Sequence, residues 1–128
     1  MKKRILVIDD EKDNASVFRI ALEDTGLYEV ISFTNPVSAL SGFKSNTYDL
    51  VILDIRMPKM NGYELYEKIK KIDDKIKVCF LTAFGEGYHE DFKRRFQAEQ
   101  LNSSATHLFF LRKPITIEDL VKKVNEII

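Results

Sequence analysis

Short apolar runs alternate with helical stripes along the chain. Five runs have the length and composition of buried β-strands, at residues 3–8, 28–33, 50–53, 76–81 and 107–111. Each is followed by a segment in which apolar residues recur at helical spacing, such as Val37, Leu40 and Phe43, or Leu65, Ile69 and Ile72. Strict alternation of strands and helices predicts an α/β fold with a parallel sheet and right-handed crossovers.

Capping residues predict where the helices begin. Asn35 is a cap with Pro36 at the first helical position, and Thr116 caps the last helix, with Asp119 three residues on as in a capping box. Two starts stay open. Asp13 or Asn14 is the candidate cap of the first helix, whereas Asn61-Gly62 either begins the third helix or makes a left-handed turn.

Composition limits the classes of protein. The 128 residues are enough for one domain and too few for two. Because 20 basic residues balance 20 acidic ones, no overall field favours nucleic acid, and we expect no direct nucleic-acid binding. The single cysteine, Cys79, excludes an internal disulfide and is typical of a reducing compartment. The apolar stretch at residues 5–8 is too short for a signal peptide or membrane insertion, so we expect a cytoplasmic protein.

Polar side chains follow four of the five strands, at the point where each strand ends: Asp9 and Asp10, Asp54, Thr82, and Lys113. In parallel sheets these ends meet at one edge, where ligands bind. Paired carboxylates suit Mg²⁺, and a carboxylate can act as a nucleophile toward phosphorus. Phosphoryl transfer needs positive charge around the moving group, which Mg²⁺ and a lysine would supply, while a hydroxyl would donate a hydrogen bond. Their joint arrival at one edge predicts a phosphoryl-transfer site.

The same residues carry a family resemblance. The chain resembles the receiver domain of two-component response regulators in these segments, in order: Asp9-Asp10-Glu11, residues 54–62 (DIRMPKMNG), Leu81-Thr82-Ala83 and Lys113-Pro114. The match spreads over essentially residues 1–128, taken as one receiver domain. The resemblance implies a flavodoxin-like (βα)5 three-layer sandwich whose five-stranded parallel sheet has the order 2-1-3-4-5.

The resemblance also implies the roles of the acids. Asp54 would accept a phosphoryl group from a histidine kinase or phosphotransfer protein. Asp10 and Asp54, with the backbone carbonyl of Arg56, would bind Mg²⁺, and Asp9 would assist largely through water. The protein would be a phosphoacceptor switch that catalyses its own phosphorylation and dephosphorylation, rather than a turnover enzyme.

The switch residues are implied in the same way. Thr82 would be the switch hydroxyl, and the backbone N–H of Ala83 would contact the phosphoryl group together with Lys113 and Arg56. Lys113-Pro114 would be a cis peptide. Phe110 would turn in behind Thr82 on phosphorylation, changing a surface made by the fourth helix, fifth strand and last helix. That surface would control an unidentified downstream protein, and a phosphorylation-dependent dimer is a further expectation.

The chain departs from the family pattern in one region. The segment between Thr82 and Lys113 is longer than usual by about two helical turns' worth of residues, with a helix expected over residues 88–101. Ser103-Ser104-Ala105 stands where the family usually has a Gly-Ala pair. The resemblance also implies that Arg56 and Phe84, two residues after Asp54 and Thr82, occupy positions that tune phosphoryl lifetime in the family. Their bulk predicts slow self-dephosphorylation.

Three other functions are compatible with parts of this pattern. A Mg²⁺-dependent phosphohydrolase with an aspartyl nucleophile commonly needs a second acid near the nucleophile, where this chain has Arg56. A flavin-binding domain of the same architecture needs a phosphate-binding loop after the first strand, where three acids stand instead. A receiver that works by protein contact alone would not need Asp54, Thr82 and Lys113 together.

Overall fold

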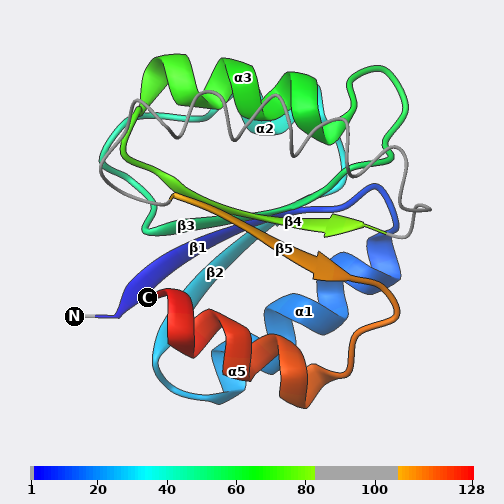
Figure 1. Ribbon diagram of the computed structural model, residues 1–128, viewed down its shortest axis with the longest axis vertical. Helices are drawn as coiled ribbons and strands as arrows, with labels where there is room; N and C mark the ends of the chain where they lie inside the picture. The colour runs from blue at the N-terminus through cyan, green and yellow to red at the C-terminus, as the bar shows by residue number, and fades with distance from the viewer. Residues whose placement is uncertain (1, 83–106) are drawn as a thin grey trace.

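The computed structural model describes residues 2–82 and 107–128, and its described strands form one parallel sheet. The order is β2-β1-β3-β4-β5, which confirms the expected 2-1-3-4-5 arrangement (Figure 1). The strands are β1 Lys3–Ile8, β2 Tyr28–Phe33, β3 Leu50–Asp54, β4 Lys77–Thr82 and β5 Leu108–Arg112. The last two lie one residue further along the chain than the apolar pattern predicted.

Helices cover both faces of the sheet and complete three layers. They are α1 Lys12–Asp24, α2 Pro36–Ser41, α3 Gly62–Ile72 and α5 Ile117–Ile127. Figure 1 shows α2 and α3 on one face and α1 and α5 on the other. The helix expected over residues 88–101 lies outside the described residues. Within the described ranges, no helix has the length and apolar character to cross a membrane.

The core is split into two layers because successive strand side chains point to opposite faces. In β3, Val51 and Leu53 pack toward α2 and α3, whereas Leu50 and Ile52 pack toward α1 and α5. All four are fully buried. The apolar run at residues 50–53 is therefore a central strand covered on both sides, as its composition predicted.

Side-chain caps fix three of the helix starts. Asn35 Oδ1 accepts from the Val37 N–H (2.9 Å), and Thr116 Oγ1 accepts from the Asp119 N–H (3.1 Å), as predicted. Asn61 forms a capping box with Glu64. This settles the open alternative in favour of a helix start, and the left-handed residue of the loop is Lys59 (φ 70°) instead.

Some local expectations were wrong. The first helix begins at Lys12 with Glu11 at the N-cap, so Asp13 and Asn14 lie inside its first turn and cap nothing. Val37 and Ile72 are exposed by 45% and 43%, so neither lies on the inner face of its helix. The short helix α2 instead buries Pro36 and Ala39. Helical spacing predicted the stripes, but how each helix rotates against the sheet is decided by tertiary packing.

Candidate functional site

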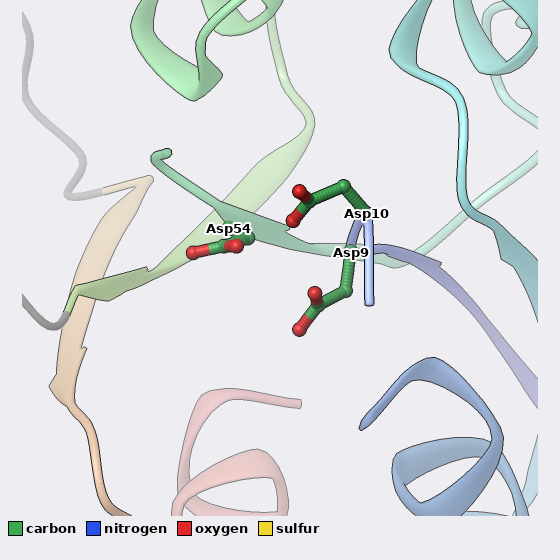
Figure 2. A group of neighbouring side chains, drawn as sticks. All are labelled: Asp9, Asp10 and Asp54. Atoms are coloured by element: carbon green, nitrogen blue, oxygen red, sulfur yellow. The ribbon is translucent and has the colours of Figure 1, made fainter. Parts of the chain in front are cut away.

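The carboxyl ends of β1 and β3 bring three carboxylates together. Asp9 and Asp10 directly follow β1, and Asp54 is the last residue of β3 (Figure 2). Hydrogen bonds between backbone groups continue past the strand ends, from the Asp9 N–H to Phe33 O (3.1 Å) and from the Ile55 N–H to Leu81 O (3.2 Å). These bonds hold the loops that carry the acids in place.

The acids differ in burial but share one space. Asp9 is fully buried, Asp54 is 6% exposed, and Asp10 is exposed to solvent. One carboxylate oxygen from each residue lies within 4.8 Å of the other two. Asp9 Oδ1 accepts the Glu11 N–H (3.0 Å), which fixes the turn into α1. The prediction that these acids meet at one edge is confirmed.

Lys113 supplies positive charge to the same space. Its Nζ lies 3.4 Å from Asp9 Oδ2 and 3.5 Å from Asp54 Oδ1, with 17% of the side chain exposed. The backbone N–H of Lys113 donates to Thr82 O (2.8 Å). This bond holds Lys113, which directly follows β5, beside the end of β4. The Lys113-Pro114 peptide is cis, as the resemblance implied.

The surroundings of Asp54 disfavour the charged form of its carboxyl group. Burial raises the pKa of its carboxyl from 3.8 to about 6; Lys113 opposes that rise, and Asp9 and Asp10 add to it. Placing carboxylates close together in a poorly solvated site disfavours the charged forms unless a cation compensates. Three hard oxygen donors at this spacing are the kind of ligands that a divalent cation such as Mg²⁺ prefers.

Asp10 and Asp54 line a pocket of about 580 Å³, together with Arg56 and Lys113. Thr82 ends β4 and is 3% exposed. The described part of the chain therefore places six of the predicted site residues at this edge: Asp9, Asp10, Asp54, Arg56, Thr82 and Lys113. Ala83 and Phe84 lie outside the described residues.

Phe110 belongs to an aromatic cluster behind the site. Its ring stacks on Phe80, with centroids 5.3 Å apart and planes at 25°. Phe80 is fully buried and also contacts the rings of Tyr63 and Tyr66 on α3, at 5.5 and 5.6 Å. The predicted switch position is therefore packed against the core layer below α3.

Gly62 shapes the loop after β3, whereas its sequence pattern predicted only a helix start or a left-handed turn. Its N–H donates to Ile55 O (2.7 Å), and a Cβ atom there would lie 2.5 Å from the backbone oxygen of Asp54. The loop can therefore fold back onto the end of β3 only with glycine at this position. The Asn61-Gly62 pair was the available signal, but it does not reveal which backbone the glycine approaches.

Comparison with known proteins agrees with this fold and site. The family model described as "Response regulator receiver domain" matches residues 5–125. The chain therefore belongs to the response regulator receiver family, whose members are phosphoacceptor switches.

Individual relatives cover the chain to different extents. The response regulator receiver protein CpdR of Brucella abortus is 31% identical over 127 residues, covering 98% of this chain and 97% of that protein. The probable transcriptional regulator ycf27 of Pyropia yezoensis is 39% identical over 85 residues, which are 66% of this chain and 34% of the relative. This chain thus spans about a third of that regulator's length.

A solved structure supports the same conclusion. The CheY-like receiver domain protein from Methanospirillum hungatei JF-1 has a TM-score of 0.76 and 27% identity, covering 98% of this chain and 93% of that one.

Proposed function

We propose that the protein is a signalling switch in which Asp54 accepts a phosphoryl group from a histidine kinase or a phosphotransfer protein. The observation that carries this proposal is the position of Lys113 Nζ, 3.5 Å from Asp54 Oδ1 and 3.4 Å from the buried Asp9. A nucleophilic carboxylate beside a fixed cation is the arrangement that phosphoryl transfer requires. An oxygen of Asp54 forms the new O–P bond while the P–N bond of a donor phosphohistidine breaks, and the leaving imidazole nitrogen takes up a proton.

Asp10, Asp54 and the backbone carbonyl of Arg56 would hold Mg²⁺, with Asp9 assisting through water and through its ion pair with Lys113. Bound there, the cation would neutralise charge on the carboxylates and on the phosphoryl oxygens. The raised pKa of Asp54 supports a cation requirement, because a nucleophilic oxygen must be deprotonated. Lys113 would hold the phosphoryl oxygens from the opposite side, with Arg56 at the pocket wall.

Thr82 and Phe110 would report the phosphorylated state. Thr82 would donate its hydroxyl to a phosphoryl oxygen beside the Ala83 N–H, and Phe110 would turn inward behind it. Phe110 is half-buried and its ring stacks on Phe80. A rotation of the Phe110 side chain would therefore change its contacts with the core. The responding surface would comprise residues 88–101, β5 and α5, and would bind a downstream protein or a second copy in a cytoplasmic signalling pathway.

The test is the intact mass of the protein after incubation with acetyl phosphate and Mg²⁺. We expect a gain of one phosphoryl group in the wild type and none in Asp54→Asn. If the wild type gains nothing from acetyl phosphate or from a phosphorylated histidine kinase, the protein works by contact alone. Continuous turnover of acetyl phosphate without a lasting adduct would support a phosphohydrolase instead.

The same experiment measures the lifetime of the adduct. We propose that it is long, because a long cation at Arg56 and a bulky ring at Phe84 would screen attacking water. Replacing Arg56 with serine should speed the loss of the phosphoryl mass. Equal decay in the two proteins would remove Arg56 from this role.

A further inference from the structure

A second pocket lies at the opposite edge of the sheet from Asp54. It encloses about 480 Å³ and is lined at the amino ends of the strands, where Lys3 begins β1 and Lys77 begins β4. Strands of this length place the two edges roughly 17–20 Å apart. The volume falls in the range of small-molecule sites, about 300–1,000 Å³.

The pocket is basic, although the chain as a whole is neutral. Five lining residues have cationic side chains (Lys2, Lys3, Arg4, Lys75 and Lys77), whereas two, Asp49 and Asp73, have acidic side chains. Among the described residues, the acids Asp9, Asp10 and Asp54 gather at the other edge of the sheet, so the two clusters differ in the sign of their charge. The five cationic side chains therefore attract an anion to this edge.

Both acids of the pocket are engaged by the backbone that shapes it. Asp49 Oδ2 accepts the Arg4 N–H (2.8 Å). Asp73 is buried, and its two oxygens accept the N–H groups of Asn46 and Lys75, each at 3.1 Å. Two of these bonds join segments far apart in the sequence, so hydrogen bonds fix the backbone that lines the pocket.

The lysine ammonium groups are not neutralised in the same way. Arg4 pairs with Glu29 (3.5 Å), and Lys77 Nζ donates to the carbonyl of Ile127 (3.0 Å). Among residues 2–82 and 107–128, no ion pair joins Lys2, Lys3 or Lys75 to a carboxylate. Three ammonium groups are thus available to a multiply charged anion. A bound anion would reduce the repulsion between these ammonium groups.

An aromatic ring lies in the same pocket. Tyr48 is a lining residue, half-buried, and its ring stacks on the buried Phe43 with centroids 5.8 Å apart and planes at 21°. A ring held in this way loses little freedom when a second ring stacks on it. Ammonium groups can pair with phosphates and a fixed aromatic ring can stack on a base, so together they match the two parts of a nucleotide.

We propose that this amino-edge pocket binds a nucleoside polyphosphate, with its phosphates at Lys2, Lys3 and Lys75 and its base against Tyr48. This site is separate from the phosphorylation pocket and does not depend on the function proposed for Asp54.

The experiment measures binding of ATP and of tripolyphosphate by isothermal titration calorimetry, in low-salt buffer with EDTA so that no cation bridges phosphate to the acidic edge. The test variant is Lys2→Gln/Lys75→Gln. The control is Lys68→Gln/Lys122→Gln, which removes the same charge from exposed positions on α3 and α5 that do not line the pocket. We expect the test variant to bind both anions at least about tenfold more weakly than the control, a loss of about 1.4 kcal/mol.

Tyr48→Leu separates the roles of ring and charge. The substitution should weaken the binding of ATP several-fold and leave the affinity for tripolyphosphate unchanged. Circular dichroism checks that the fold is intact. Equal weakening in the test and control variants would show a diffuse charge effect and overturn the proposal. Binding of inorganic sulfate as tightly as ATP would also overturn it, because the pocket would then be a general counter-ion site.

Discussion

Replacing Asp54 with asparagine should stabilise the protein in the absence of divalent cations, although it removes the proposed phosphorylation site. Asp54 is 6% exposed and lies beside Asp9 and Asp10. Its pKa is raised from 3.8 to about 6, chiefly by burial, so its charged form is less favourable in the folded protein than in the unfolded chain. Asparagine has nearly the same shape and carries no charge.

The pKa values determine the sign and the pH range. Because the folded state binds the Asp54 proton more tightly than the unfolded chain does, the contribution of Asp54 to stability is greatest below about pH 4 and declines as the pH rises through about 6. Each pKa unit corresponds to about 1.4 kcal/mol, so the full loss has an upper value of about 3 kcal/mol. Water in the open pocket reduces it, and we expect Asp54→Asn to be about 1–3 kcal/mol more stable than the wild type at pH 8.

Urea-induced unfolding, followed by far-ultraviolet circular dichroism at several pH values between 4 and 8 with EDTA, measures this difference. The matched control is Asp74→Asn, which removes the same charge from an exposed position between α3 and β4. We expect the Asp54→Asn gain to grow with pH, and the control difference to stay within about 0.5 kcal/mol. A gain that does not change with pH, or an Asp54→Asn protein less stable than the wild type at pH 8, would refute the reasoning.

Three further predictions concern the same site. Mg²⁺ should raise the melting temperature of the wild type and have little effect on Asp54→Asn in a thermal scan, because the variant lacks one carboxylate of the cation site; equal shifts would argue against binding there. Lys113→Met should destabilise the protein by about 2–4 kcal/mol in urea unfolding, because it leaves the buried Asp9 without its 3.4 Å cation, and should slow labelling by acetyl phosphate at least about tenfold. Gly62→Ala should cost about 2 kcal/mol or more, since its Cβ would lie 2.5 Å from the Asp54 backbone oxygen. Gly42→Ala should cost less than about 1 kcal/mol in the same assay, because its Cβ would lie 3.9 Å from the Ser38 backbone oxygen.

Local signals in the sequence were sufficient to predict the described strands and helices and most of the residues at the acidic edge. The run at residues 50–53 predicted a buried strand because four consecutive apolar residues can be covered only on both faces of a sheet. Asn35 and Thr116 predicted helix starts because a cap acts within three residues of itself. Once parallel strands follow from the alternation of elements, Asp9, Asp10, Asp54, Thr82 and Lys113 must share one edge.

Tertiary structure decided what depends on distant segments. The strand order came from the family resemblance and was confirmed by the sheet, because the apolar pattern of a strand does not specify its neighbours. Val37 and Ile72 satisfied the helical spacing but face outward, since the rotation of a helix is set by the surface it packs on. The Asp9–Lys113 ion pair spans 104 residues of chain, and the approach of Gly62 to the Asp54 backbone depends on how a loop folds back. The basic pocket likewise exists only because the starts of β1 and β4 and the residues before β3 meet at one edge, which no local stretch of sequence encodes.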